Sequence, residues 1–206
     1  MNDSRLIDPQ AVATAPLAEV RQALLGLFAE VAYKEGDFVL SSGQPSPYYI
    51  NGKLVTLHPW GGLAVGRVLL AQVAEGAIAV AGLTLGADPL VTATSVVAAY
   101  EGRSLTALIV RKEAKGHGTQ AYIEGPALPA NSVVTVLEDV VTTGNSALKA
   151  VDRLKAAGYE VRQIISLVDR QQGGAELYAQ HGLEFQAVFT IPEIQQEWRS
   201  RQPATP

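Results

Sequence analysis

The chain places two carboxylates directly before a loop that is rich in hydroxyl groups. Glu138 and Asp139 end the apolar run VVTVL, and the residues TTGNS follow after two valines. Successive backbone N–H groups in such a loop, with the start of a following helix, form a cradle for an anion. Carboxylates would repel an anion, but they accept hydrogen bonds from the vicinal hydroxyls of a sugar. The two halves of this stretch therefore predict a site for a sugar phosphate.

The candidate ligands in this stretch lie between an expected strand and an expected helix. Hydroxyl and amide groups supply donors, and the glycine lets the backbone approach a phosphate closely. The candidate set is Glu138, Asp139, Val140, Val141, Thr142, Thr143, Gly144, Asn145 and Ser146. A plainer interpretation is an ordinary strand–loop–helix connection, in which Thr143 or Asn145 caps the helix and the acids are solvated. The glycine spacing matches neither the P-loop nor the dinucleotide-binding pattern.

A second candidate is the cationic segment RKEAKGHGT, which follows the apolar run TALIV. Arg111, Lys112, Lys115 and His117 lie close together there, although the whole chain has a net charge of −4. Long loops interrupted by glycine are typical of segments that close over a substrate. If an anionic group gains charge during a reaction, cations that close over it stabilise the transition state more than the ground state. The alternative is a solvated, charged connection without a role in catalysis.

Composition limits the classes of protein that remain. The 206 residues are 48% hydrophobic and 17% charged, without cysteine, which is typical of one compact α/β domain rather than a disulfide-stapled chain. No uninterrupted apolar run is long enough to span a membrane, and the N-terminal residues lack the pattern of a secretory signal. The acidic balance argues against a nucleic-acid partner. We expect a cytoplasmic protein with a loose lead-in at 1–16, one domain at 17–200 and a frayed tail at 201–206.

Apolar runs of strand length alternate with segments of helical period, which predicts an α/β fold with a parallel sheet covered on both faces. The expected strands are 77–81, 106–110, 133–137, 163–168 and 185–190. The expected helices are 17–32, 63–75, 89–99, 147–157 and 175–181. Asp88 is expected to cap the third helix, and Gly158 to end the fourth. The candidate loops then follow strands at the carboxyl edge of the sheet, where open α/β sheets bind ligands.

The segment VLEDVVTTGNS resembles the phosphoribosyl pyrophosphate signature of the type I phosphoribosyltransferases. Its order of apolar residues, two acids, two apolar residues and a Thr/Gly/Ser loop is similar to theirs. The cationic segment narrows the resemblance, because RKEAKGHGT is similar to the catalytic loop of orotate phosphoribosyltransferases, with Arg-Lys-x-x-Lys-x-His-Gly intact. That resemblance implies a homodimer in which Lys112, Lys115 and His117 serve the neighbouring subunit, with Arg111 near the shared boundary.

Two further segments carry the same resemblance. The pattern SGQPSPYY is similar to the base-pocket segment of the family, and Lys53 agrees with its usual basic residue. Asn51 and Ser41 stand where many members have Asp and some have Lys, so neither side chain is given a catalytic role. VDRQQGG resembles the family's V-D-R-x-x-G-G, whose arginine, here Arg170, contacts orotate; from the residues alone, a surface ion pair is the alternative. An arginine fork suits a planar carboxylate, and Thr142 matches a position that also contacts orotate.

The resemblance implies the type I phosphoribosyltransferase fold, with a five-stranded parallel sheet, flanking helices and a small N-terminal hood. It implies transfer of ribose 5-phosphate from phosphoribosyl pyrophosphate to orotate, which gives orotidine 5′-phosphate in pyrimidine synthesis. Mg²⁺ is the implied cofactor, held mostly by substrate and water. Lys112, Lys115, His117 and Asp139 are the implied catalytic residues. The glycine-rich junction AGLTLGADP at 81–89 is implied to face the pyrophosphate, with a plain tight connection as the alternative.

Two other functions remain open at this stage. A phosphoribosyltransferase for another base would share the phosphate site and differ around Arg170. A non-catalytic regulator on the same fold would sense a nucleotide while binding DNA or RNA, and it would carry an added helix-turn-helix or an extended basic face. The sequence has neither feature, so we expect no nucleic-acid partner and no membrane partner.

Overall fold

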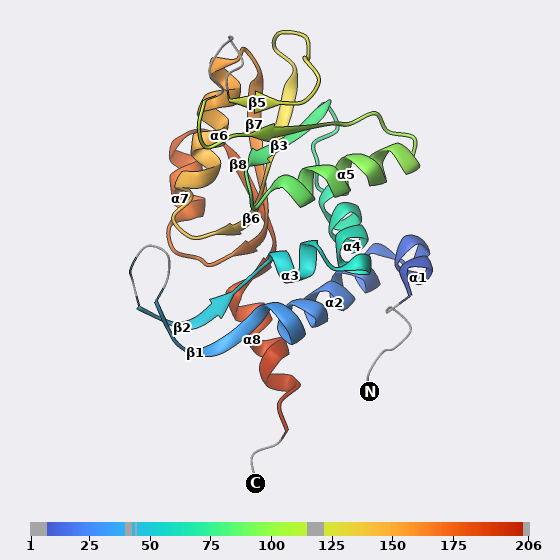
Figure 1. The fold of residues 1–206 in the computed structure, drawn as a ribbon, viewed down its shortest axis with the longest axis vertical. Coiled ribbons are helices and arrows are strands. Elements are labelled where there is room, and N and C mark those ends of the chain that lie inside the picture. Colours follow the sequence, from blue (N-terminus) through green and yellow to red (C-terminus); the bar gives the residue numbers. More distant parts are fainter. Residues whose placement is uncertain (1–7, 40–42, 44, 115–121, 204–206) are drawn as a thin grey trace.

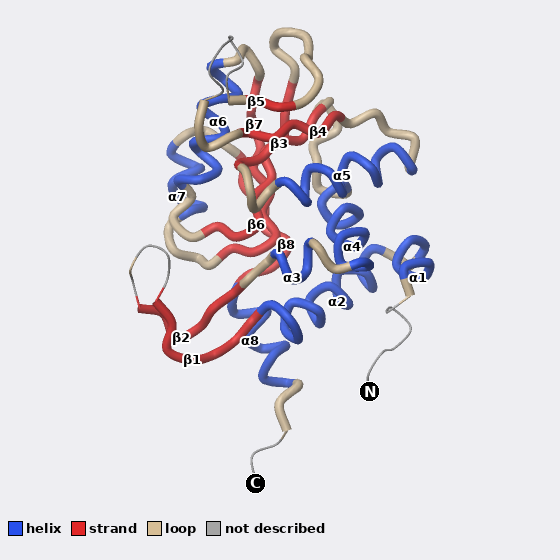
Figure 2. Tube along the Cα trace, viewed as in Figure 1, coloured by secondary structure: helices blue, strands red, loops and turns tan. Residues whose placement is uncertain are grey.

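The computed structural model describes residues 8–39, 43, 45–114 and 122–203, in which strands and helices alternate (Figures 1 and 2). The helices are α1 (Pro9–Thr14), α2 (Leu17–Leu27), α3 (Lys53–Thr56), α4 (Pro59–Leu70), α5 (Asp88–Tyr100), α6 (Asn145–Ala156), α7 (Gly174–Gln180) and α8 (Ile191–Ser200). The strands are β1 (Tyr33–Val39), β2 (Pro45–Ile50), β3 (Ala79–Leu83), β4 (Thr106–Val110), β5 (Ile123–Glu124), β6 (Val133–Val141), β7 (Glu160–Asp169) and β8 (Glu184–Thr190). No helix among these residues combines the length and the apolarity that a membrane span requires.

The main sheet has six strands within the described residues, in the order β5-β4-β3-β6-β7-β8. Five of them run parallel, which confirms the expected sheet, and β5 adds a two-residue antiparallel edge. The first parallel strand, β3, has β4 on one side and β6 on the other, so the connections that follow β3 and β6 leave in opposite directions. Open α/β sheets bind ligands at such a switch point, beyond the carboxyl ends of the strands.

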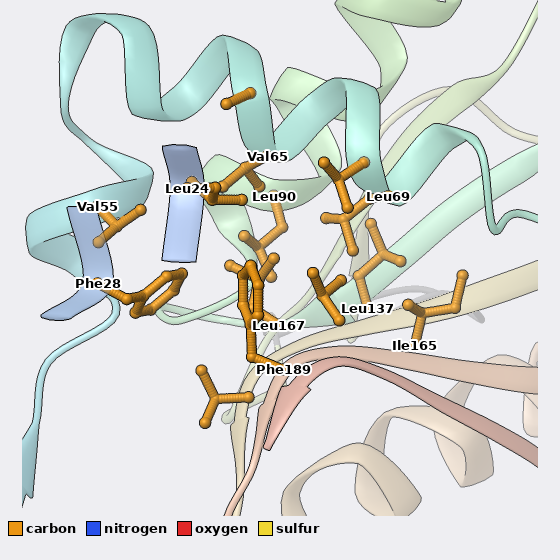
Figure 3. Packing of buried hydrophobic residues seen from close by; sticks show 14 of the residues in the cluster. Leu24, Phe28, Val55, Val65, Leu69, Leu90, Leu137, Ile165, Leu167 and Phe189 are labelled. Carbon is orange, nitrogen blue, oxygen red and sulfur yellow. The ribbon is translucent and has the colours of Figure 1, made fainter. Parts of the chain in front are cut away.

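Successive side chains of the central strands point to opposite faces of the sheet, so the strands contribute to two cores, one on each face. Ile165 belongs to the core under α4 and α5, whereas its neighbour Ile164 belongs to the core under α6 and α7. Figure 3 shows the first core, in which Leu69 and Leu90 from the helices gather with Leu137 from the sheet. Because both faces are covered, the strands appear in the sequence as nearly continuous apolar runs.

The N-terminal hairpin and the last helix form the small hood that the resemblance implies. β1 and β2 pair as an antiparallel hairpin, and α8 lies beside β1 (Figure 1). Tyr33 joins these elements, because its ring stacks on Tyr48 at 5.8 Å and meets Trp198 edge-on at 5.7 Å. A capping box of Thr190 and Glu193 starts α8 directly after β8. The hood therefore depends on residues from both ends of the chain.

The N-terminal segment is more ordered than expected. The loose lead-in expected at 1–16 is wrong for its second half, because α1 lies there and Val12 is fully buried. Arg67 of α4 donates from Nη1 to the carbonyl of Val12 at 2.6 Å and to that of Ala15 at 2.8 Å, which holds the segment on the domain. The helix expected at 17–32 is α-helical only to Leu27 and continues as a π-helix over Phe28–Ala32.

β6 extends four residues beyond the expected end at Leu137 and reaches Val141. The physical reason is its neighbour β7, which continues to pair with it and places Val140 opposite Val168. Glu138 and Asp139 therefore lie in the strand rather than in a loop.

Candidate active site

Two strand ends meet at the switch point of the sheet. β3 leads through Gly86 into α5, and the neighbouring β6 carries Asp139 near its end. A Cβ atom added to Gly86 would lie 2.6 Å from Asp139 Oδ1, so glycine is required for the carboxylate to fit. The expectation that Asp88 caps α5 is wrong, because Ala87 is the N-cap and Asp88 Oδ2 accepts a hydrogen bond from Thr84 Oγ1 at 2.9 Å.

The loop between β6 and α6 has the geometry of an anion cradle. Gly144 is the N-cap of α6 in the left-handed region, with φ +86°, and no side chain caps the helix. The plainer interpretation required Thr143 or Asn145 to cap α6, but Asn145 Nδ2 instead donates to Thr143 Oγ1 at 3.1 Å. Among the described residues, no side chain therefore occupies the N–H groups of the first helical turn, which are available to a ligand.

A polar cavity of about 90 Å³ opens at this helix start. Its lining contains every candidate of the signature stretch except Asp139. The lining residues are Glu138, Val140, Val141, Thr142, Thr143, Gly144, Asn145, Ser146, Ala147 and Tyr178. The Asp139 carboxylate lies beside Lys53 of α3 and Gly86, which precedes α5.

Tyr178 of α7 lies beneath the cradle. A Cβ atom on Gly144 would lie 2.9 Å from the Tyr178 ring, so the ring and the loop are in close contact. The Tyr178 hydroxyl is buried and has no hydrogen-bond partner among the described residues. Burial, and then the carboxylates of Glu138 and Asp169, raise the pKa of Tyr178, which keeps the phenol neutral. The cradle therefore rests on a neutral ring beside two acids.

Glu138 and Asp139 occupy different environments. Glu138 is 6% exposed, and its Oε2 has no hydrogen-bond partner in the described part of the chain. Burial, and then the charge of Asp139, raise the pKa of Glu138 well above its usual range. Asp139 faces Lys53, whose Nζ lies 3.5 Å from Oδ2. The pair offers one buried acceptor and one carboxylate beside a cation, which suits the hydroxyl groups of a sugar.

Arg170 lies just beyond the end of β7 and is held by the hood. Its Nε donates to the Tyr48 hydroxyl at 3.0 Å, and its Nη2 donates to Ser46 Oγ at 3.3 Å. The guanidinium also lies over the Tyr48 ring, 4.8 Å from its centre. Arg170 is 9% exposed, and no carboxylate among the described residues pairs with it, so the alternative of a surface ion pair is wrong. A buried guanidinium without a carboxylate partner suits an anionic ligand.

The cationic segment begins at the carboxyl end of β4. Arg111 Nη1 pairs with Glu124 Oε1 at 2.8 Å, and the Arg111 backbone N–H donates to the Tyr122 carbonyl at 2.7 Å. Lys112 follows and is exposed. The candidates Lys115 and His117 lie outside the described residues, as does Ser41. The structure therefore fixes where the segment leaves the sheet and where it returns.

The sequence analysis did not assign the individual roles of several residues near the site. Ser46 and Tyr48 hold Arg170, and their alternation in β2 puts both on one face of that strand, a signal that the sequence does contain. Tyr178 carries no motif. Arg153 of α6 donates from Nη2 to the Lys112 carbonyl at 2.8 Å, although its place on the polar side of the helix predicts only a solvated side chain.

A parallel sheet with a hood, and a phosphate cradle preceded by two acids, define the class of the type I phosphoribosyltransferases. Orotate phosphoribosyltransferase from a Nostoc species is 68% identical over 187 residues, which cover 91% of each chain. The enzyme of that name from a Synechocystis species is 65% identical over 191 residues, 93% of this chain and 96% of the relative. The Mycobacterium tuberculosis orotate phosphoribosyltransferase in complex with 5-phospho-α-D-ribosyl 1-diphosphate is similar in structure, with a TM-score of 0.72 and 33% identity over 85% of this chain and 99% of that chain. The chain belongs to the orotate phosphoribosyltransferase family.

The sequence model of the uracil phosphoribosyltransferase family also matches, over residues 88–192. The matched part contains the acid pair, the cradle and Arg170, and it leaves out the hairpin β1–β2 that holds Arg170. The match therefore covers the region that binds the sugar phosphate in this class, whereas the orotate phosphoribosyltransferase relatives extend over the hood as well.

Proposed function

We propose that this chain transfers the 5-phosphoribosyl group from phosphoribosyl pyrophosphate to a ring nitrogen of orotate, giving orotidine 5′-phosphate and pyrophosphate in pyrimidine synthesis. Two relatives named orotate phosphoribosyltransferase support the proposal, and they align with 91% and 93% of the chain. The observation that carries it is the buried Arg170 guanidinium, which no carboxylate of the described residues neutralises, near a phosphate cradle. The cytoplasmic location expected from the sequence is part of the proposal.

The cradle holds the 5-phosphate in the proposed mode of binding. The loop of Thr142–Ser146 supplies backbone N–H groups and hydroxyls, and the positive end of the α6 dipole adds to them. Val140 and Val141 bring the chain to the cavity. Glu138 and Asp139 accept hydrogen bonds from the ribose hydroxyls, and Lys53 Nζ lies 3.5 Å from Asp139 Oδ2. The acids and the cradle thus bind two ends of one molecule without opposing each other.

Arg170 accounts for the choice of orotate in this proposal. A guanidinium has five N–H donors. The hydrogen bonds to Tyr48 and Ser46 fix the plane of the Arg170 guanidinium, and its other N–H groups can donate to a ligand. Orotate carries a carboxylate that uracil lacks, and a planar fork binds a carboxylate through two parallel bonds. Thr142, at the start of the cradle, is the second proposed contact to the base.

The cations of the loop act on the leaving group. As the bond from C1 to pyrophosphate breaks, C1 develops oxocarbenium character and the leaving oxygen gains negative charge. Lys112, Lys115 and His117 neutralise that charge, and closure of the loop keeps water from the cation. Arg111, held by Glu124 at the base of the loop, contributes its charge from the boundary of the site.

Mg²⁺ is the cofactor in this proposal. Among the described residues, no three His, Cys, Asp or Glu side chains gather as a metal site. In the proposed mode of binding, substrate oxygens and water hold most of the positions around the ion. Glu138 Oε2, buried without a partner in the described chain, and the nearby Asp139 are the acceptors that would hold the hydroxyls and waters around it. When bound, the ion neutralises charge on the pyrophosphate.

A homodimer that shares its active-site loops is also part of the proposal. An apolar groove of about 650 Å³ lies at α3, α4 and α5, and its lining residues Leu57, Leu85 and Val96 are 70%, 65% and 51% exposed. Exposed apolar surface of this kind is typical of a protein interface. Lys53 lines the groove and also contacts Asp139, so a second copy seated there would lie next to the first copy's site.

Turnover with competing bases tests the proposed reaction. Orotate should be consumed in the presence of phosphoribosyl pyrophosphate and Mg²⁺, whereas uracil, adenine and hypoxanthine should not. Arg170→Gln should raise the KM for orotate by on the order of 100-fold, because a charged hydrogen bond contributes about 2–3 kcal/mol. Arg162→Ala, which removes an exposed arginine that pairs with Glu160, is the control. Equal use of uracil and orotate would overturn the choice of base.

Mixing two inactive variants tests the shared loop. A Lys112→Ala subunit keeps its acids, and an Asp139→Asn subunit keeps its cations. If each loop serves the neighbouring site, random pairing of the two should restore about a quarter of the wild-type activity, because half of the dimers are mixed and each has one complete site. No recovery on mixing would show that the loop serves its own subunit.

A further inference from the structure

Arg153 of α6 contacts both ends of the cationic loop. Its Nη1 donates to the carbonyl of Arg111, and its Nη2 donates to the carbonyl of Lys112 at 2.8 Å. Its guanidinium carbon lies 4.0 Å from the centre of the ring of Tyr122, where the chain returns toward β5. One guanidinium therefore binds two carbonyls on the outgoing side of the loop and an aromatic ring on the returning side.

The helix that carries Arg153 begins at the phosphate cradle. Asn145, the first residue of α6, lies eight positions earlier, which is about 12 Å along a helix with a rise of 1.5 Å per residue. Between these ends, Ala147, Val151 and Leu154 are buried against the sheet, so the helix is fixed to the domain. The cradle and the base of the cationic loop are therefore connected through a single rigid element.

We propose that Arg153 is a positioning residue for the transfer reaction, which fixes the base of the cationic loop to α6 of its own subunit, so that the loop cations reach the neighbouring site from a rigid base. Holding the Lys112 carbonyl fixes the plane of the following peptide, and with it the direction in which the Lys112 side chain leaves the backbone. The inference rests on the proposed role of the loop cations toward pyrophosphate. It assigns to Arg153 no contact with the substrate.

The contacts require an arginine rather than a general cation. A planar guanidinium can donate two bonds to neighbouring carbonyls while its face stacks on an aromatic ring. A lysine ammonium is a compact charge on a flexible stem, so it can satisfy one carbonyl but cannot keep all three contacts. Arg153→Lys should therefore restore only part of the kcat and of the pyrophosphate affinity that Arg153→Ala loses.

Two inhibitors separate the loop from the cradle. Ribose 5-phosphate occupies the cradle and the acids without a pyrophosphate, whereas inorganic pyrophosphate depends on the loop cations. For Arg153→Ala, the inhibition constant of pyrophosphate should rise about tenfold, as expected for the loss of roughly 1.4 kcal/mol, and kcat should fall, while the inhibition constant of ribose 5-phosphate stays within about twofold. A general loosening of the domain would weaken both inhibitors, and that result would overturn the proposal.

Matched variants test the positioning role of Arg153 separately from the proposed role of the loop cations toward pyrophosphate. Lys155→Ala removes an exposed cation from the same helix and should leave both inhibition constants unchanged. Tyr122→Leu removes the ring from the returning side and should reproduce the Arg153→Ala pattern in a weaker form, which keeps the test open if Arg153→Ala folds poorly. If Lys112→Ala leaves pyrophosphate inhibition intact, the proposed role of the loop fails. If Lys112→Ala weakens it and Arg153→Ala does not, the role of Arg153 fails alone.

Discussion

Gly86 and Asp139 lie more than fifty residues apart in the chain but are in contact at the switch point of the sheet. The Asp139 carboxylate fills the space that a side chain at residue 86 would need. A Cβ atom at residue 86 would lie 2.6 Å from Oδ1 and 2.8 Å from Oδ2 of Asp139. The glycine-rich junction after β3 thus makes room for an acid at the end of β6. The same carboxylate faces Lys53 of α3, 3.5 Å away, so three separate segments determine its position.

Gly86→Ala should displace the Asp139 carboxylate and lower kcat/KM for phosphoribosyl pyrophosphate by about 100-fold, the usual cost of a misplacement near 1 Å at a reacting centre. Steady-state kinetics with a thermal unfolding curve would measure it. Gly76→Ala is the matched control, because nothing lies within 4 Å of a Cβ atom there. Unchanged kinetics in Gly86→Ala would mean that the Asp139 carboxylate is free to move without loss.

Tyr48→Phe should weaken orotate binding while leaving phosphoribosyl pyrophosphate binding intact. The variant keeps the ring under Arg170 but removes the acceptor that holds its Nε at 3.0 Å. A hydrogen bond to a charged group contributes about 1.5–3 kcal/mol, so the KM for orotate should rise roughly tenfold or more. Tyr49→Phe, on the exposed side of the same strand, is the control. The link between hood and base is refuted if both variants bind orotate equally.

Glu138→Gln should change how the stability of the free protein depends on pH. Burial raises the pKa of Glu138 in the folded chain, so the folded state still binds its proton after the unfolded chain, with an ordinary glutamate pKa of about 4.3, has released it. The free energy of unfolding of the wild type should therefore fall, relative to that of the variant, as pH rises from about 4.3 through the raised pKa.

Urea unfolding at pH 5 and pH 8 measures this difference. At pH 8 the variant should be more stable than the wild type by on the order of 1 kcal/mol, because the raised pKa of Glu138 lowers the wild-type free energy of unfolding as pH rises above the unfolded pKa. Glu160→Gln, at a half-buried carboxylate paired with Arg162, should show no such gain at pH 8. A constant difference between Glu138→Gln and wild type at the two pH values would contradict the raised pKa.

Tyr178→Phe should leave the free protein as stable as the wild type, or make it more stable by about 1 kcal/mol. Its hydroxyl is buried without a partner among the described residues, and removing such a group while keeping the ring is neutral or favourable. The ring contact with Gly144 stays. Urea unfolding checks the prediction, and a loss above about 1 kcal/mol would reveal a hydrogen bond of the hydroxyl that stabilises the fold.

The local patterns of the chain predicted much of the fold and the phosphate cradle. Continuous apolar runs such as TALIV located β4 without error, whereas α6 begins at Asn145, two residues before the expected start at 147. The end of β6 was predicted too early, because pairing with β7 extends the strand through the acids. The hairpin and α8 were not found from patterns, since the stacking of Tyr33 on Tyr48 and its contact with Trp198 are long-range.

The sequence by itself predicted the candidate chemistry: which segment is suited to a phosphate, which offers acids and which supplies cations, because each depends on residues adjacent in the chain. The tertiary structure alone decided how these groups face one another. Arg170 meets Tyr48 across 122 positions, and Arg153 meets Arg111 across 42. The order of strands in the sheet brings such pairs together, and that order follows from the packing of two whole faces rather than from any local pattern.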